Sequence, residues 1–271
     1  MDADSANKKQ IDKVENIKDR RFVTALSRGL HVLECFKFGD QYLGNNQIAE
    51  RTGLPKATVS RLTYTLKELG YLRYSESLGK YNFGPSLVNI GYSLLSNMGI
   101  RRIARPLMQA LVEHSSGAVN LGVREGLHMV YVDTYRSATN LLLQLDVGSK
   151  LPLSTSAMGR AYLCALSDEK RGELLEQIQL SDEENWPQIK RGIDQALRDY
   201  QKYGYCLSLG AWRAEINAVS VPLILKDGSG IMAFSCGGPS FQFNEKLIKT
   251  DIGPRLLNLV GNVKTALNST T

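Results

Sequence analysis

The sequence predicts an α+β protein with two domains. Residues 48–72 (IAERTGLPKATVSRLTYTLKELGYL) have the apolar spacing of two helices separated by a turn. From residue 118 onward, short apolar runs alternate with turn residues, as they do in an antiparallel sheet. The chain has 271 residues, of which 43% are hydrophobic, and this is enough apolar material for two modest domains.

Residues 21–84 are expected to form the first domain, a helix-turn-helix followed by a wing. The apolar residues of segment 48–72 give each helix one buried face, with Leu54 beneath the turn. Gly53 suits a positive φ at the end of the first helix, and Pro55 suits the first turn of the second. A fixed turn of about three residues is typical of helix-turn-helix motifs. An ordinary helical hairpin with a solvated face is the alternative.

The outward face of the second helix carries small polar groups and two cations, with no acid before Glu68. Such a face suits a groove lined by phosphates, and side chains near the start of the helix would reach base edges in the major groove. We therefore expect contacts with double-stranded operator DNA from Lys56, Ala57, Thr58, Ser60, Arg61, Thr63 and Tyr64.

Residues 70–84 are expected to form the wing. Two short runs with strand-like composition lie on either side of a turn at residues 75–79, which predicts a β-hairpin. Arg73 and Lys80 would stand at its flanks, where we expect them to contact the sugar-phosphate backbone of DNA.

Residues 85–98 are expected to form a linker helix that also mediates dimerisation. Its apolar residues fall on two stripes, and a helix that is apolar on two sides needs two partners. One partner would be its own domain and the other the same helix of a second subunit, whereas a core helix in a monomer is the alternative. The first stripe is Leu87, Ile90, Leu94 and Met98, and the second is Val88, Tyr92 and Leu95.

Residues 99–268 are expected to form the second domain. AVNLGVR and LHMVYVDTY predict one hairpin, NLLLQLDV predicts a further strand, and INAVSVPLIL and IMAFSCGG predict another hairpin. Helical patterns cover residues 156–178, 187–203 and 244–267. A sheet with helices on one side is the expected architecture of this domain.

The sequence favours a binding domain over an enzyme. It contains no GxSxG, GxxxxGK[ST], GxGxxG or HExxH motif, and its three histidines are isolated from one another. We therefore expect no cofactor, no catalytic residue and, since no cluster has the spacing of ligands, no metal site. The four cysteines lie in apolar contexts without CxxC spacing, as reduced thiols of cytoplasmic proteins do.

A candidate anion site lies at the start of the predicted helix 156–178. Ser154, Thr155 and Ser156 precede this helix, so hydroxyls and backbone N–H groups converge near Ala157 and Met158. A simple helix N-cap by Ser154 or Ser156, which requires no ligand, is the alternative.

After residue 20 the chain resembles the IclR-type bacterial transcriptional regulators. The resemblance rests on segments of specific order and spacing: SRGLHVLECF, IAERTGLPKATVSRLTYTLKELGYL, GKYNFGPSLVNIG, ARPLMQAL, LPLSTSAMGRAYLCAL and GYCLSLGAWRAEINAVSVPL. It implies a winged helix-turn-helix, a linker helix and a GAF-like effector-binding domain of α/β fold. It also implies dimers or tetramers on operator DNA.

By position, the resemblance assigns Ala157, Met158 and Ser235 to the lining of the effector pocket. Relatives that bind small carboxylates often have S-x-S-G-P on the late strand, whereas this chain has SCGGP from Ser235, so one hydroxyl is missing. A more apolar pocket follows, in which Trp212 and Arg213 could recognise an aromatic or larger acid. An exposed loop pair is the alternative for these two residues.

The resemblance thus implies a sequence-specific DNA-binding transcriptional regulator, repressor or activator, controlled by a small organic effector such as an organic or aromatic acid. An effector-independent DNA-binding protein and a metabolic enzyme with a fused DNA-binding domain are the alternatives. The formal charge of +6, most of it in the first 84 residues, agrees with a nucleic-acid partner.

The first 20 residues are expected to be a disordered tail, because their acids nearly match their bases and they lack an apolar run. A helical arm that enters the minor groove is the alternative. The segment lacks the apolar stretch of a signal peptide, and no stretch of about eighteen apolar residues occurs in the sequence, so we expect a cytoplasmic protein without a membrane partner.

Overall fold

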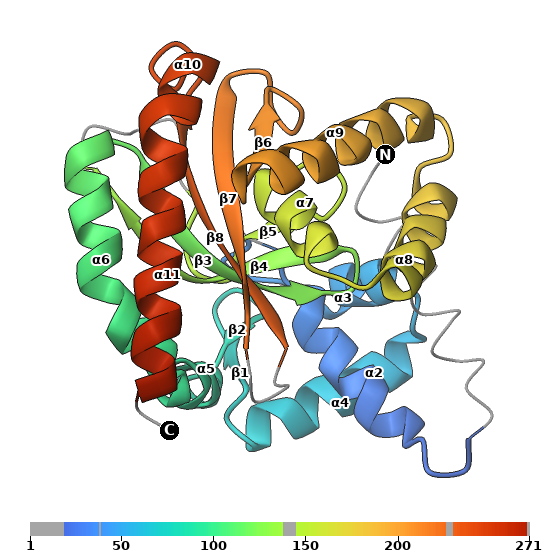
Figure 1. The fold of residues 1–271 in the computed structure, drawn as a ribbon. Coiled ribbons are helices and arrows are strands. Elements are labelled where there is room, and N and C mark those ends of the chain that lie inside the picture. The colour runs from blue at the N-terminus through green and yellow to red at the C-terminus, as the bar shows by residue number, and fades with distance from the viewer. Residues whose placement is uncertain (1–18, 38, 138–144, 226–229, 270–271) are drawn as a thin grey trace. The chain divides into compact units, whose positions relative to one another are not determined.

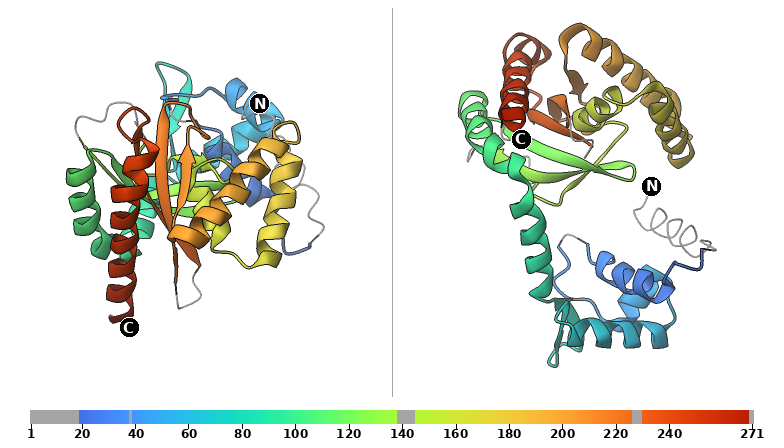
Figure 2. Two further views of the ribbon diagram at one scale, coloured as in Figure 1. Left: turned by 45° about the horizontal axis from the view of Figure 1, so that its top comes forward. Right: turned by 60° about the horizontal axis from the view of Figure 1, so that its bottom comes forward.

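The computed structural model describes residues 19–37, 39–137, 145–225 and 230–269. The chain divides into two compact units, Met1–Asn97 and Met98–Thr271 (Figures 1 and 2). The predicted tail, most of the predicted strand at 140–147 and the turn between the last two predicted strands lie outside the described residues.

The first unit contains the predicted helix-turn-helix. Helices α2 (Thr24–Glu34), α3 (Asn45–Thr52) and α4 (Lys56–Glu68) contact one another around a shared core. Helix α3 ends at Gly53, whose φ of 66° is the left-handed conformation that favours glycine. Pro55 is the N-cap of α4, and its carbonyl accepts the Thr58 N–H at 2.9 Å. The core of this unit comprises Val32, Cys35, Phe36, Leu43, Ile48, Leu54, Val59, Leu66 and Leu72.

The predicted wing is present. Strands β1 (Leu72–Ser75) and β2 (Lys80–Phe83) pair in antiparallel fashion. The turn between them includes Gly79 at a φ of 61°. Two backbone hydrogen bonds of 2.8 and 2.9 Å join Leu43, from the segment between α2 and α3, to Tyr81 and so attach the wing to the helical part.

Helix α5 (Ser86–Asn97) follows the wing. None of its residues is buried against the part of the chain that the structure describes. Val88, Ile90, Tyr92 and Leu94 keep 56–72% of their surface exposed. Exposed apolar side chains at this density are typical of a protein–protein interface.

The second unit is built on an antiparallel sheet. The strands are β3 (Ala118–Glu125), β4 (His128–Arg136), β5 (Lys150–Pro152), β6 (Cys206–Leu209), β7 (Ile216–Ile224) and β8 (Ile231–Pro239). Across the described residues their order in the sheet is β5-β4-β3-β8-β7-β6. The hairpins β3–β4 and β7–β8 are those that the sequence predicts, whereas β5 was not foreseen because three residues carry too little periodicity.

Helices cover both faces of this sheet, and the expectation of helices on one side was wrong. Ser235 of β8 faces α7 (Ala157–Cys164), while the next residue, Cys236, has its Sγ 3.7 Å from Ser115 at the end of α6 (Gly99–Ser115). Successive side chains of a strand point to opposite faces, so α6 and α7 lie on opposite sides. Helix α11 (Gly253–Ser269) contacts α6, and α9 (Trp186–Tyr203) contacts α7 (Figure 1).

The long helix predicted over 156–178 is two helices. Helix α7 ends at Cys164, and Ser167 then caps α8 (Asp168–Ser181) by accepting the Lys170 N–H at 3.4 Å. The N-cap preference of serine decides this break over the continuous apolar pattern. The predicted closing helix is present without a gap, as α10 (Glu245–Leu247), a π-helical turn at Ile248–Ile252 and then α11.

Candidate functional site

Helix α4 presents a polar face on the surface of the first unit. Lys56, Ala57, Ser60, Arg61 and Tyr64 are exposed, and Thr58 is half-buried. Their opposite face holds Val59 and Leu66 in the core. The cations near the start of the helix therefore project freely into solvent, as a helix that reads the major groove requires.

Thr63 is predicted to lie on the outward face, but its side chain is fully buried. Its hydroxyl lies 3.0 Å from the Val59 carbonyl and 3.3 Å from Oδ1 of Asn45, at the start of α3. Thr63 lies four residues after Val59, on the inward stripe of α4, and its hydroxyl is satisfied there without water. It therefore joins α3 to α4 and is not part of the outward face.

The wing carries its two predicted cations on separate strands. Arg73 on β1 is exposed and Lys80 on β2 is half-buried. Between them, the rings of Tyr74 and Tyr81 pack with centroids 4.9 Å apart. This ring pair stiffens the hairpin that carries both cations.

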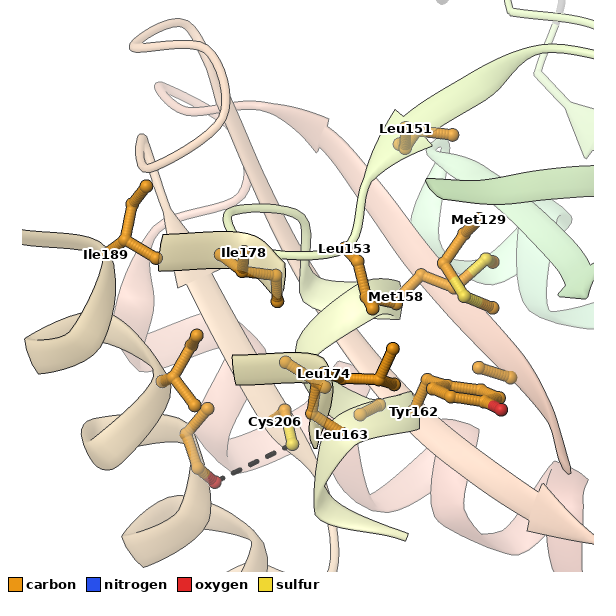
Figure 3. Packing of buried hydrophobic residues seen from close by; sticks show 14 of the residues in the cluster. Met129, Leu151, Leu153, Met158, Tyr162, Leu163, Leu174, Ile178, Ile189 and Cys206 are labelled. Carbon is orange, nitrogen blue, oxygen red and sulfur yellow. Dashed lines mark hydrogen bonds between the residues drawn. The ribbon is translucent and has the colours of Figure 1, made fainter. Parts of the chain in front are cut away.

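The second unit contains a pocket between the sheet and the N-terminus of α7. Its empty space is about 440 Å³, which includes its opening to solvent. Two of its lining residues, Met158 and Leu151, also belong to a buried apolar cluster that includes Met129 and Leu153 (Figure 3). The lining consists of Asn120, Tyr131, Leu151, Ser156, Ala157, Met158, Ser208, Trp212, Ile216, Ala218, Ser235 and Gly237.

The residues predicted around the start of α7 divide into two groups. Ser156, Ala157 and Met158 line the pocket, whereas Ser154 and Thr155 do not. The backbone carbonyl of Ser154 accepts Arg160 Nε at 3.3 Å, and that of Thr155 accepts the Ser208 hydroxyl at 2.9 Å. These two residues therefore support the pocket through their backbone.

Ser156 is the N-cap of α7. Its hydroxyl accepts the Gly159 N–H at 3.0 Å and lies 2.6 Å from the Pro152 carbonyl, to which it donates. The hydroxyl thus both donates and accepts a hydrogen bond within the fold. Ala157 and Met158 lie in the first turn of α7, where backbone N–H groups have no acceptor inside the helix, and both residues line the pocket.

A polar group formed by β3, β4 and β8 lies in the same pocket. Asn120 Nδ2 donates to the Ser235 hydroxyl at 3.4 Å, and Asn120 Oδ1 accepts the Thr134 hydroxyl at 2.6 Å. Burial raises the pKa of the Tyr131 phenol, and its hydrogen bond with Ser235 opposes that shift only in part. Tyr131 is therefore neutral and able to donate at physiological pH.

Trp212 lines the pocket, and the Arg213 guanidinium lies over its ring at 4.5 Å from the centroid. The sequence analysis offered this pair as possible ligand contacts in the pocket, with an exposed loop pair as the alternative, and it missed Asn120, Tyr131 and Ser208. Asn120 had a usable signal, since it is an amide inside the apolar run AVNLGVR, and a polar residue buried in a strand needs partners.

The described residues give no support for a metal site or for a membrane-spanning helix. None of them form a group of three or more His, Cys, Asp or Glu side chains that could hold a metal ion. His114 Nε2 is 2.7 Å from Asp251 Oδ2, in a pair on the surface of the second unit. None of the described helices combines the length and apolarity that crossing a membrane requires.

Comparison with known protein families covers nearly the whole chain. Residues 25–76 match the IclR helix-turn-helix domain, and residues 92–260 match the C-terminal domain of the bacterial transcriptional regulator IclR. The chain belongs to the IclR family of bacterial transcriptional regulators. Its first unit accordingly contains a DNA-binding helix-turn-helix domain, and its second unit contains most of the IclR C-terminal domain.

Individual IclR relatives agree with this assignment. The HTH-type transcriptional regulator TsaQ1/TsaQ2 of Comamonas testosteroni is 33% identical over 91% of this chain and 89% of its own length. The Pca regulon regulatory protein of Pseudomonas putida is 26% identical over 80% and 75% of the two chains. These relatives are named as regulators of transcription.

Solved structures of the IclR family share the fold. The crystal structure of an IclR family transcriptional regulator from Brucella abortus is 48% identical, with a TM-score of 0.84 over 92% of this chain and 94% of that one. An IclR homologue from Microbacterium hydrocarbonoxydans, complexed with 4-hydroxybenzoate, has a TM-score of 0.72 at 22% identity over 90% and 99% of the two chains.

Proposed function

We propose that this IclR regulator binds its operator through the exposed face of α4 and the wing, and that a small aromatic carboxylic acid in the pocket of the second unit controls that binding. The observation that carries the proposal is a pocket lined by the first turn of α7, the Ser235 and Tyr131 hydroxyls and the Trp212 ring. Acting on operator DNA, the protein would work in the bacterial cytoplasm.

Operator recognition rests on the exposed residues of α4 and the wing. Arg61 and Ser60 would contact base edges, since they lie in the first half of the helix, and Arg pairs well with guanine. Arg73 and Lys80 would bind phosphates beside the groove and position the helix without selecting sequence. Lys56, Ala57, Thr58 and Tyr64 complete the proposed contact surface.

Two copies of the chain would bind together. The apolar side chains that α5 exposes would pair with those of a second α5, because a helix with this much apolar surface is stabilised by burial. Two recognition helices held in this way would read half-sites about 10 base pairs apart, or a multiple of this spacing. A homodimer, or a homotetramer made from two such dimers, is the proposed assembly.

The pocket suits an acid that has a ring. Its carboxylate would accept hydrogen bonds from the Ala157 and Met158 N–H groups at the positive end of α7. The Ser235 hydroxyl would add a further donor. The ring would lie against the apolar lining and Trp212, where aromatic stacking is favourable. The 4-hydroxybenzoate complex of the Microbacterium relative supports this class of ligand.

The effector would act by preferring one of two conformations of the regulator. A ligand can shift operator affinity only by the ratio of its affinities for those two states. Repression relieved by the effector and activation that requires it are both compatible with this mechanism. Whether the effector relieves repression or is needed for activation is set by which of the two states binds the operator.

The experiment begins with an operator selected from a library of random duplexes. Operator affinity is then measured with and without a panel of aromatic and aliphatic carboxylates, starting with 4-hydroxybenzoate, and calorimetry measures direct binding. We expect at least one aromatic acid to bind and to change operator affinity. Calorimetric silence across the panel, with unchanged operator affinity, would contradict the proposal.

A further inference from the structure

Two thiols lie against each other at the end of α7. The Sγ atoms of Cys164, the last residue of α7, and Cys206, the first residue of β6, are 3.4 Å apart. Cys206 is fully buried, and its thiol also lies 3.6 Å from the Ala196 carbonyl of α9 (Figure 3). Cys164 is partly exposed to solvent. Neither thiol belongs to the lining of the pocket.

We infer that Cys164 and Cys206 form a modification site, at which hydrogen peroxide produces a reversible disulfide within one chain. A disulfide bond is about 2.05 Å long, so the two sulfurs need to approach by only about 1.3 Å. The pair joins segments that are 42 residues apart in the sequence. The site is therefore created by the fold and has no CxxC signature.

The partly exposed thiol is the one that reacts first. The Cys164 thiolate attacks one oxygen of hydrogen peroxide, the O–O bond breaks, and Cys164 becomes a sulfenic acid. The hydroxide that leaves takes up the proton that the Cys164 thiol lost and becomes the first water. The Cys206 sulfur then attacks the Cys164 sulfur, so that an S–S bond forms and the S–O bond breaks. The Cys206 proton leaves with that oxygen as a second water. Together the two thiols lose two electrons, and the peroxide is reduced to water.

The surroundings fit this order of events. Burial raises the pKa of the Cys206 thiol well above its ordinary value, and the hydrogen bond with Cys164 adds to the shift. Cys206 is therefore the thiol that reacts second, and it suits the resolving role because the sulfur that it attacks is 3.4 Å away. Arg160 lies one turn before Cys164 on α7 and is buried near both thiols, and its charge opposes part of the rise in the pKa of the Cys206 thiol. Its Nη1 donates to the Leu207 carbonyl at 3.4 Å, which holds it beside β6.

Oxidation at this site would reach the proposed effector pocket. Helix α7 contributes Ser156, Ala157 and Met158 to the pocket, and β6 contributes Ser208, two residues after Cys206. A bond between α7 and β6 draws two walls of the pocket together. This consequence rests on the proposed function, whereas formation of the disulfide does not.

The test uses the reduced full-length chain, treated with hydrogen peroxide. The chain has four cysteines, so we expect two titratable thiols to disappear and dithiothreitol to restore them. Peptide mapping without reductant should then recover a peptide that joins residues 164 and 206 within one chain. Retention of all four thiols, or a disulfide that involves Cys35, Cys236 or a second chain, would overturn the inference.

Single substitutions separate the two roles. Cys206→Ser should leave a sulfenic acid at Cys164 that a dimedone probe captures, while Cys164→Ser should keep its remaining thiols reduced. Cys236→Ala is the matched control, because Cys236 is also fully buried but lies beside Ser115 on the opposite face of the sheet. This control should still lose two thiols. Equal thiol loss in wild type and Cys164→Ser would overturn the assigned order.

Coupling to the pocket has its own readout. Calorimetry with 4-hydroxybenzoate, on reduced and oxidised wild type and on Cys164→Ser, should give an affinity that changes on oxidation only in the wild type. An unchanged wild-type affinity would refute the coupling and leave the disulfide intact. If the disulfide forms but neither redox state binds an aromatic acid, the proposed function fails and the modification site stands.

Discussion

The Asn45 side chain donates a hydrogen bond to the Ser60 hydroxyl across 3.2 Å, while its oxygen lies 3.3 Å from the buried Thr63 hydroxyl. One carboxamide at the start of α3 therefore contacts two successive turns of α4. This contact orients Ser60 on the exposed face, next to Arg61. The surface proposed to read DNA is thus held by a residue outside the recognition helix.

Replacing Arg61 with Ala should weaken operator binding by about 1–3 kcal/mol, because a bidentate contact with guanine would be lost. Affinity for a random duplex should fall much less. Both affinities are to be measured at one fixed salt concentration, with Lys67→Ala as the control. Lys67 is an exposed cation at the far end of α4, where it pairs with Glu68 at 3.1 Å. An unchanged ratio of operator to random affinity would contradict the role of Arg61.

Lys80→Ala should weaken operator and random duplexes alike, because a phosphate contact carries no sequence information. The slope of log affinity against log salt should fall in magnitude by about one unit. Titrations over a range of salt concentrations measure this slope. Lys246→Ala, which removes an exposed cation from the second unit, should leave the slope unchanged. A wild-type slope for Lys80→Ala would remove the wing from the interface.

The first unit could be predicted closely because its signals are local. Gly53 and Pro55 specify a turn whatever surrounds them, and the positive φ of Gly53 is as expected. The prediction that Thr63 lies on the outward face was wrong because its polar side chain was given more weight than its position along the helix. Its spacing from Val59 places it on the inward stripe, and a hydroxyl can be satisfied by the helix backbone.

The pocket was harder to predict because its residues meet only in three dimensions. Ser235 is next to Asn120 through pairing of β8 with β3, across 115 residues of sequence. Register between distant strands is not encoded by any short pattern. The helices on both faces were missed for the same reason, since periodicity shows that a strand is buried but not what covers it. The domain boundaries of the sequence analysis stay a prediction.

Asp40→Asn should destabilise the first unit at neutral pH. Hydrogen bonds from Arg51 hold the pKa of the Asp40 carboxyl below its ordinary value of 3.8, so the native state is stabilised when Asp40 is charged. That stabilisation is present above the ordinary pKa and is lost as the pH falls through the lowered value. Since the two side chains keep 21–25% of their surface exposed, we expect only about 1 kcal/mol.

Urea unfolding of wild type and Asp40→Asn across pH 2–7 measures this difference, with Asp168→Asn as the control. Asp168 is almost fully exposed and pairs with Arg171 within α8 of the second unit. The free energies of unfolding of wild type and Asp40→Asn should converge at the acid end of this range. A difference that persists unchanged to pH 2 would show that the cost is not electrostatic.

Leu94→Asp should shift the protein from dimer to monomer, because it places a charge on the apolar stripe proposed to pair, where desolvation is costly. Light scattering at micromolar concentration measures the assembly, and footprinting measures the length of operator covered. Leu180→Asp is the control, since Leu180 is an exposed leucine on α8 of the second unit. A wild-type protein that is monomeric and protects one half-site would refute the proposed assembly.

Two pocket variants should separate loss of a hydrogen bond from loss of space. Ser235→Ala removes a donor to the effector carboxylate, and a charge-assisted bond contributes about 1.5–3 kcal/mol, so the effector should bind about 10- to 150-fold more weakly. Met158→Trp adds bulk beside Gly122, where even a Cβ on that glycine would be 2.3 Å from the Met158 sulfur. It should abolish the response to effector by occlusion. Cys236→Ala, on the same strand but the opposite face, should leave effector affinity intact.

Calorimetry, thermal unfolding and operator binding with and without effector distinguish these outcomes, because a folding defect lowers stability and ligand-free DNA binding together. Wild-type affinity and full response in both variants would contradict binding of the effector in this pocket.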